Sequence, residues 1–244
     1  MRKKVLITEA VSDVGLNFLR ENGYELVIGT GPSEATLLKE CPDCDGALTR
    51  NGKFTAQVFD ACPKLKVVSM HGIGVDGIDV DAATVRGIQV CNAAESNQRS
   101  VAEYAIGLIL MLAKQSVTYH NGLKNGKMMD VRKVYGSDVS GKTLGIIGMG
   151  NIGTQVARMA AHGLGMNVIG YSRRITKEQK MDFGVLTPDM KLVISSADYL
   201  SLHLPGSGST QKLLSAEKLS WMKSSAFLIN TGRGEVIDES ALIQ

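Results

Sequence analysis

Cysteine is scarce in this chain of 244 residues, which has only four: Cys41, Cys44, Cys62 and Cys91. So few thiols cannot staple a chain of this length, and we expect them to be reduced, as they are inside cells. Cys41 and Cys44 have the CxxC spacing of a redox or zinc site, but no second Cys/His pair completes a zinc shell. We therefore interpret them as ordinary thiols near a turn and predict no bound metal.

The sequence also lacks an excess of one charge and any long apolar run. Its net charge of +3 comes from 27 basic and 24 acidic residues that are interspersed along the chain. This pattern gives no polyanion-binding face, so we predict no nucleic-acid partner. No apolar run approaches the ~20 residues of a membrane span, and residues 1–4 lead straight into a β-like run without a cleavable apolar region. We expect a cytoplasmic protein without a membrane partner.

Short β-branched runs alternate with helix-like segments from the first residue, which is typical of parallel α/β architecture. The expected strands of the first half are 5–8, 26–28, 46–49, 65–69 and 88–90, and the expected helices are 12–23, 55–61 and 79–86. Ser12 is a candidate N-cap, and Gly23 suits the left-handed position after the helix.

A long amphipathic helix is predicted next, because apolar residues recur at helical spacing from Val101 to Leu112. It joins two domains, with the boundary near Asn97, and is followed by a polar stretch at 120–140. The second domain has expected strands 143–147, 167–171, 199–202 and 226–230, a helix at 151–163, and a helix capped by Ser215 that reaches Trp221. We predict two α/β domains with parallel Rossmann-like or flavodoxin-like sheets, residues 1–97 and 98–244.

Gly148, Gly150 and Gly153 form a G-x-G-x-x-G that leaves a predicted strand and opens a predicted helix. In this context the pattern is specific for dinucleotides, whereas alone it is weak. The first glycine permits the tight turn, the second lets the backbone approach a pyrophosphate, and the third lets helix and strand pack closely. The free N–H groups of the helix start, at Asn151 and Ile152, then hold the phosphates.

The residues after the next predicted strand bear on which nicotinamide coenzyme is used. An acidic residue there would bind the ribose 2′-OH of NAD, but the sequence has Tyr171, Ser172, Arg173 and Arg174. Two guanidinium groups suit a 2′-phosphate, so we predict that NADP(H) is preferred and that NAD(H) remains possible. The alternative is that both arginines belong to a solvated turn and that either coenzyme is used.

Five motifs in order resemble the D-2-hydroxyacid dehydrogenase family, which includes phosphoglycerate, glyoxylate/hydroxypyruvate and D-lactate dehydrogenases. They are residues 72–79 (GIGVDGID), 92–103, 141–148 (GKTLGIIG), 202–205 (LHLP) and 230–239 (NTGRGEVIDE). The resemblance spans nearly the whole chain. It implies a substrate domain at 1–97 and a cofactor domain at 98–244, with the active site between them, and reduction of a small 2-oxo acid.

The resemblance also assigns residues to the site. Arg233 would bind the substrate carboxylate and polarise the 2-oxo group, and the alternative is a structural ion pair. The backbone of Ile73 and Gly74 would surround the carboxylate, and a plain turn is the alternative. The cofactor would lie beside Thr231, Arg233 and the motif that contains His203, Leu204 and Pro205. Arg50 could contact a distal acidic group of the substrate, or be a solvated surface arginine.

The family pairs a catalytic histidine with a glutamate, several tens of residues beyond the Arg233 motif. The histidines present, His71, His120, His162 and His203, do not match that position and are interpreted as structural. Residues 238–244 open a helix without a stop signal. We therefore expect a C-terminally truncated piece of an enzyme, incomplete in both domains and inactive by itself. A naturally short, inactive relative is the alternative.

A non-catalytic NAD(P)-sensing protein, as in the corepressors that share this fold, is the alternative from another functional class. A formate dehydrogenase is less favoured, since that branch has a longer N-terminal region. Family members commonly pair through the cofactor domain, so a homodimer is expected, although the apolar face of the helix at 101–112 could equally pack within the chain.

Overall fold

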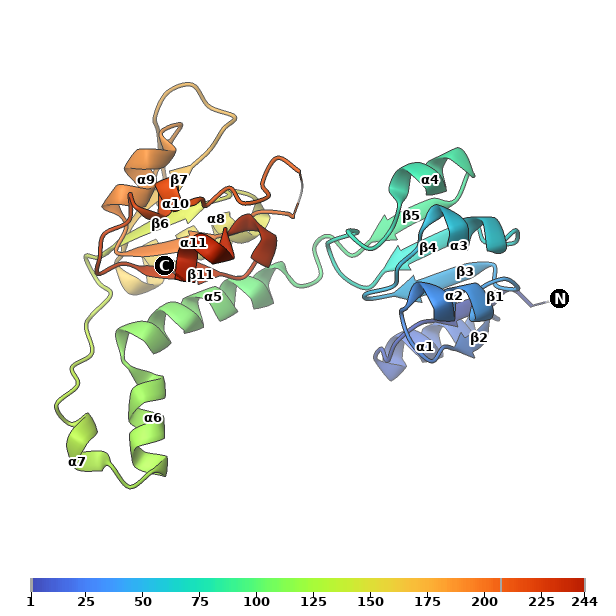
Figure 1. Cartoon of the computed structure of the whole chain (residues 1–244), viewed down its shortest axis with the longest axis horizontal. Coiled ribbons are helices and arrows are strands. Elements are labelled where there is room, and N and C mark those ends of the chain that lie inside the picture. The colour runs from blue at the N-terminus through green and yellow to red at the C-terminus, as the bar shows by residue number, and fades with distance from the viewer. Residues whose placement is uncertain (1, 207, 244) are drawn as a thin grey trace. The chain divides into compact units, whose positions relative to one another are not determined.

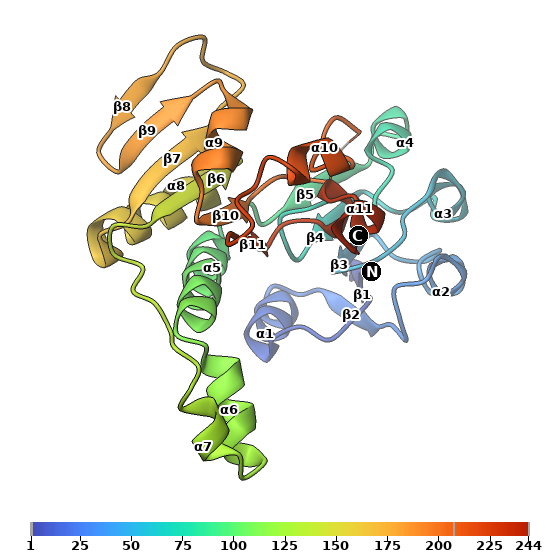
Figure 2. The ribbon, with the colours of Figure 1, turned by 60° about the vertical axis from the view of Figure 1, so that its left-hand side comes forward.

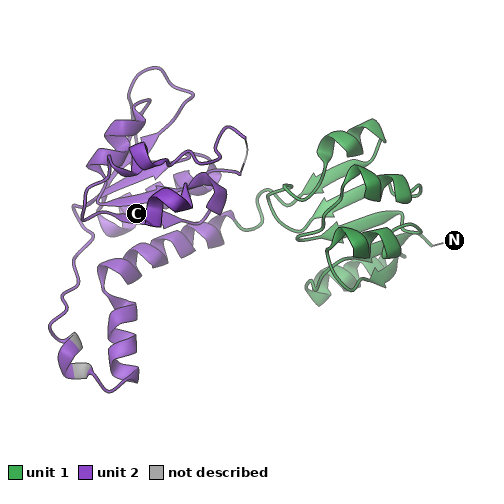
Figure 3. Ribbon diagram, viewed as in Figure 1, with its two compact units in different colours: residues 1–97 green, residues 98–244 purple. Residues whose placement is uncertain are grey.

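The structure, a computed structural model, describes residues 2–206 and 208–243, apart from the side chains of Met128 and Val131. The chain divides into two compact units, unit 1 (Met1–Asn97) and unit 2 (Gln98–Gln244), as Figure 3 shows. Among the described residues, no single helix is both long and apolar enough to cross a membrane. Only helices Gln98–Ala113 and Ser116–Lys124 together meet those criteria, and they are bent by 65° at their junction.

Unit 1 is a parallel sheet with the strand order β2-β1-β3-β4-β5, and Figure 1 labels its elements. Its elements in chain order are β1 (Lys4–Ile7), α1 (Asp13–Glu21), β2 (Glu25–Ile28), α2 (Glu34–Glu40), β3 (Gly46–Thr49), α3 (Ala56–Ala61), β4 (Val67–Met70), α4 (Val80–Val85) and β5 (Gln89–Asn92). The order reverses between β1 and β3, as in flavodoxin-like sheets, where ligands bind at the carboxyl ends of the strands.

Local sequence explains several boundaries in unit 1. The Ser12 hydroxyl accepts the Val14 N–H at the start of α1, and Gly23 follows that helix at φ +84°. The prediction for α1 is thus confirmed at both ends. Helix α2 was not predicted, because its seven residues bury only Leu37.

Unit 2 begins with three helices and continues as a six-stranded sheet in the order β11-β10-β6-β7-β9-β8. Its elements in chain order are α5 (Gln98–Ala113), α6 (Ser116–Lys124), α7 (Met128–Val131), β6 (Thr143–Ile147), α8 (Asn151–Arg158), the π-helix η1 (Met159–Gly163), β7 (Asn167–Tyr171), β8 (Gln179–Met181), β9 (Gly184–Thr187), α9 (Met190–Ser196), β10 (Tyr199–Leu202), α10 (Ala216–Leu219), β11 (Phe227–Asn230), the 3-10 helix η2 (Gly234–Val236) and α11 (Glu239–Ile243).

Two clusters of buried side chains hold the helices of unit 2 to its sheet. One contains Ala105 and Ile109 of α5 and Val156 of α8, together with residues of β6 and β7. The other contains Val193 and Ile194 of α9 together with residues of β6 and β10. The strands of a doubly wound sheet are covered on both faces, and all four residues of β10 are accordingly buried.

Several predictions for unit 2 need correction. The polar stretch at 120–140 contains the end of α6 and all of α7, and the antiparallel strand β8, β9 and α9 were not predicted. Figure 2 shows β8 and β9 beside β7. Ser215 is the N-cap of α10, but its side chain makes no capping hydrogen bond, and the helix ends at Leu219 before Trp221. The helix predicted from residue 238 is α11, and Gln244 lies outside the described residues.

Two residues of α9 differ in burial, and this difference leads to a prediction about stability. Ile194 is fully buried between this helix and the sheet, whereas Leu192 on the same helix is 39% exposed. We expect Ile194→Ala to lower the free energy of unfolding by about 3 kcal/mol, because it removes buried methyl groups and leaves a cavity. Leu192→Ala, the matched control, should cost under about 1 kcal/mol. Urea unfolding measures both; equal losses would contradict the assigned burial.

Candidate functional site

The glycine-rich turn lies at the carboxyl end of β6, where the sheet order reverses because β7 and β10 flank β6 on opposite sides. Gly148 has φ +106°, and a Cβ there would lie 2.4 Å from the His203 carbonyl oxygen. A Cβ at Gly153 would lie 2.2 Å from the Gly148 oxygen, so neither position can hold a side chain. A Cβ at Gly150, in contrast, would meet nothing within 4 Å.

The start of α8 is suited to an anion. Gly150 is its N-cap and supplies no side-chain acceptor, so no side chain caps the first turn at Asn151 and Ile152. Uncapped N–H groups and the helix dipole both favour negative charge at this end of a helix. The open space over Gly150 adjoins these groups, and the residues therefore fit the pyrophosphate of a dinucleotide.

The segment after β7 lies at the same edge of the sheet. The Ser172 N–H donates to the Thr187 oxygen (3.0 Å), and the Ser172 hydroxyl accepts the Arg174 N–H (3.3 Å). These bonds turn the chain just beyond the strand. Both Arg173 and Arg174 are exposed there, and no acidic side chain stands between Tyr171 and Arg174.

The carboxyl ends of β10 and β11 meet at His203. Its Nε2 lies 2.9 Å from the Ser201 hydroxyl, and its Nδ1 lies 3.3 Å from the Thr231 hydroxyl. Burial lowers the pKa of His203 to about 4, so the ring is neutral near pH 7. A neutral ring with both nitrogens engaged is poorly suited to donate a proton, but it does hold Thr231 beside the turn that Gly148 makes.

Backbone and amide contacts fix the turn that carries Arg233. The Asn230 amide donates to the Arg233 oxygen (3.0 Å) and accepts the Gly232 N–H (3.0 Å). Arg233 is exposed, and a Cβ at Gly206 would lie 3.0 Å from its Cγ. The structure thus brings Arg233 beside the segment after β10, where Leu204 is half-buried and Pro205 is exposed.

The predicted substrate loop, Ile73 and Gly74, belongs to unit 1 and follows β4. The Ile73 oxygen accepts the Asn92 side-chain amide (2.8 Å), and the Gly72 oxygen accepts the Ala93 N–H (2.9 Å). Because their carbonyl groups bond to the segment after β5, this short loop is held against the carboxyl end of the first sheet.

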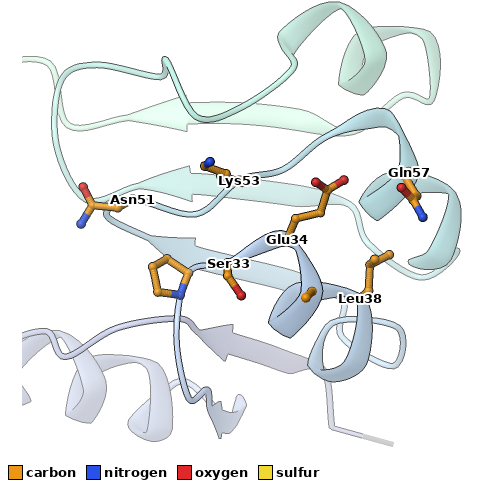
Figure 4. Close-up of a pocket in the computed structure, with 8 residues that line it drawn as sticks. Ser33, Glu34, Leu38, Asn51, Lys53 and Gln57 are labelled. Carbon is orange, nitrogen blue, oxygen red and sulfur yellow. The ribbon is translucent and has the colours of Figure 1, made fainter.

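A shallow pocket of about 660 Å³ also lies in unit 1, but none of the predicted site residues lines it. Figure 4 shows its lining side chains, which come from the β2–α2 connection, the β3–α3 connection and both helices. They are Pro32, Ser33, Glu34, Ala35, Leu38, Asn51, Lys53 and Gln57. Two of them, Asn51 and Lys53, belong to the turn that follows β3, and Arg50, the candidate substrate contact, is in the same turn.

The CxxC cysteines are free thiols inside unit 1. Cys41 and Cys44 are both buried, and Cys62 is buried in the same hydrophobic cluster. A hydrogen bond with Cys62 and burial raise the pKa of the Cys41 thiol, and burial raises that of Cys44. Both thiols are therefore protonated near pH 7. In the described parts of the chain, no three His, Cys, Asp or Glu side chains gather to hold a metal ion.

Comparison with known proteins identifies the relatives of this chain. The "D-isomer specific 2-hydroxyacid dehydrogenase, NAD binding domain" family matches residues 106–244. D-3-phosphoglycerate dehydrogenase of Methanocaldococcus jannaschii is 39% identical over 243 residues, which are 99% of this chain and 46% of that protein. The chain thus spans about half the length of the curated relatives that it matches.

Two solved structures extend the comparison. One is NADPH-dependent glyoxylate/hydroxypyruvate reductase from Sinorhizobium meliloti in complex with NADP and malonate (TM-score 0.85, 30% identity, 100% of this chain and 75% of that chain). The other is NAD-dependent formate dehydrogenase from Staphylococcus aureus in complex with NAD (TM-score 0.85, 29% identity, 100% and 77%). With its glycine turn at the centre of a doubly wound sheet, the chain belongs to the D-isomer-specific 2-hydroxyacid dehydrogenase family.

Proposed function

We propose that this protein is an oxidoreductase that transfers a hydride between a nicotinamide coenzyme and a small D-2-hydroxy acid or 2-oxo acid. The observation that carries the proposal is the open space over Gly150 at the uncapped start of α8, at the point where the sheet order reverses. Such a position is where doubly wound proteins bind dinucleotides. Family membership supports the reaction type.

The coenzyme, when bound, supplies or accepts the hydride, and the residues of unit 2 bind and orient it. The N–H groups at the start of α8 would hold the pyrophosphate. Thr231, positioned by His203, and the segment of Leu204 and Pro205 would line the rest of the site. Because His203 is neutral and engaged at both nitrogens, we assign it a positioning role.

Arg233 would bind the substrate carboxylate and polarise the 2-oxo group as negative charge develops on its oxygen. A guanidinium is suited to this because its planar fork can donate two parallel hydrogen bonds. Asn230 holds the backbone of this turn, which limits the loss of order on binding. The backbone N–H groups of Ile73 and Gly74 in unit 1 are proposed to bind a carboxylate of the substrate.

The protein should reduce a 2-oxo acid with NADPH, and two variants should separate binding from turnover. Gly150→Ala should keep the wild-type melting temperature, because its Cβ enters open space, but weaken NADPH binding at least tenfold. Arg233→Gln should weaken NADPH binding much less than Gly150→Ala does, but lower kcat/KM at least about 100-fold. Fluorescence titration and a panel of 2-oxo acids measure the two effects, with Arg158→Gln, an exposed arginine on α8, as control.

The protein made from the whole coding sequence and the 244-residue chain should both enter this assay. We predict that the 244 residues alone turn over little 2-oxo acid, and measurable activity at this length would contradict that. Coenzyme binding without turnover in the protein made from the whole coding sequence would favour the dinucleotide-sensing alternative. If NADPH and NADH both fail to bind, the proposed function is wrong.

NADPH is the proposed preference, because Arg173 and Arg174 are exposed beyond β7 and no carboxylate occupies the neighbouring turn. Replacing both with alanine should raise KM for NADPH at least about tenfold, through loss of charge-assisted bonds to the 2′-phosphate. KM for NADH should change less than about twofold. The double variant Lys177→Ala, Lys180→Ala removes the same charge from exposed neighbours and should leave both constants unchanged. A wild-type preference for NADH would overturn the assignment.

The cytoplasm is the proposed location.

A homodimer that forms through unit 2 is the proposed assembly. Large apolar side chains are exposed on α5, α6 and the segment after them: Tyr104, Met111, Val117, Leu123, Met129 and Tyr135. Exposed apolar patches commonly mark protein interfaces. Sedimentation equilibrium should give twice the mass of one chain, and Leu123→Glu should shift it toward one. A monomeric wild type would exclude this assembly.

A further inference from the structure

An acidic residue that follows β1 in unit 1 is bound almost entirely by another loop. The Glu9 carboxylate accepts the backbone N–H groups of Arg50 (3.0 Å) and Asn51 (2.8 Å) on Oε2, and the Asn51 side-chain amide (2.7 Å) on Oε1. The Thr8 hydroxyl donates to Oε2 as well (3.2 Å). Burial raises the pKa of Glu9, but the hydrogen bonds from Asn51 and Arg50 outweigh this and leave it lowered.

The turn that Glu9 holds, residues 50–54, has a second anchor below it. The buried Thr49 hydroxyl accepts the Gly52 N–H (2.8 Å) and bonds to the Thr8 hydroxyl (2.9 Å). Thr8 and Glu9, the two residues directly after β1, therefore fix the start and the middle of this turn. Both lie at the reversal between β1 and β3, the edge of the sheet where ligands bind in this architecture.

The 50–54 turn in turn supports the loop that contains Ile73 and Gly74. The Phe54 N–H donates to the Gly77 oxygen and the Asp79 N–H to the Phe54 oxygen, both at 2.9 Å. The backbones approach so closely that a Cβ at Gly77 would lie 2.6 Å from the Gly52 oxygen. At its other end, the His71 N–H donates to the Thr49 oxygen (2.7 Å). Movement of residues 50–54 would thus displace the 72–78 loop.

We propose that Glu9 is a positioning residue for the substrate: it fixes the 50–54 turn, and through it the backbone N–H groups of Ile73 and Gly74 and the root of the Arg50 side chain. This inference rests on the proposed function, because it takes the 72–78 loop to be the site of the substrate carboxylate. Charge-assisted bonds to backbone N–H groups are stronger than neutral ones, which suits a carboxylate for holding a loop in one conformation. The N–H groups of Ile73 and Gly74 would bind the carboxylate equally in the ground state and in the transition state, so their displacement should raise KM more than it lowers kcat.

Glu40 offers a matched control in the same unit. Its carboxylate accepts the Thr30 N–H (3.1 Å) and the Thr30 hydroxyl (2.6 Å), so it also anchors a loop. That loop meets the 50–54 turn where the Lys53 N–H donates to the Pro32 oxygen (3.0 Å), but the bonds of Glu40 go to Thr30 and not to Arg50 or Asn51. Glu9→Ala should raise KM for the 2-oxo acid at least about tenfold, with kcat and KM for coenzyme changed less than about threefold. Glu9→Gln, which keeps one acceptor oxygen, should restore much of the loss. Glu40→Ala should leave all three constants near wild type.

Hydrogen exchange on the same variants supplies a readout that does not need turnover. In Glu9→Ala the N–H groups of Arg50 and Asn51 should exchange at least about tenfold faster, and in Glu40→Ala they should be unchanged. Faster exchange with an unchanged KM in an active protein would overturn the positioning role and leave the proposed function intact. Unchanged exchange would overturn the anchor itself. If the protein made from the whole coding sequence is inactive, the proposed function is refuted, and with it the role of Glu9 toward substrate, whatever the exchange shows.

Discussion

The close approach of three backbone segments at the carboxyl end of β6 is the constraint on which unit 2 depends. Gly148 lies against the carbonyl of His203, and Gly153 lies against Gly148 itself, so the turn, the helix and the end of β10 exclude side chains from one another. This contact aims the start of α8 at the edge of the sheet and leaves the surface over Gly150 open. The remaining groups, from β7, β10 and β11, gather at that edge because their strands are parallel to β6.

Local sequence patterns predicted those helices and strands whose own residues favour the structure that they adopt in the fold. The strand β6 contains an apolar run that follows Lys142 and Thr143, and α1 has a serine cap and is followed by a glycine. Elements were missed where packing decides the structure. In α9 the segment of Leu192, Val193, Ile194 and two serines contains β-branched residues typical of strands. It is a helix that starts at an Asp189 cap and packs against the sheet. Strand β8 is polar and has only three residues, so no periodicity reveals it.

The residues of the candidate site also fall into two groups: those that a sequence identifies by itself, and those that only the fold brings together. The glycine turn, the arginines after β7 and the Asn230–Arg233 turn are short contiguous segments, and a sequence contains everything needed to identify them. Glu9 is different, because its partners lie 41 and 42 residues away and become neighbours only when β1 and β3 pair. The one available signal was an acidic residue directly after the first strand. The contact of His203 with Thr231 likewise depends on the register between β10 and β11.

The antiparallel strand β8 forms one edge of the sheet of unit 2 and pairs with β9. A parallel sheet that ended at β9 would present unpaired backbone groups of Gly184–Thr187 to any extended chain in solution. β8 covers them with three exposed residues, one of which is Lys180, and a lysine on such an edge opposes further strand addition. β8 contributes little to the core. Its exposed polar residues oppose the pairing of further strands, and so the aggregation of chains, at this edge of the sheet.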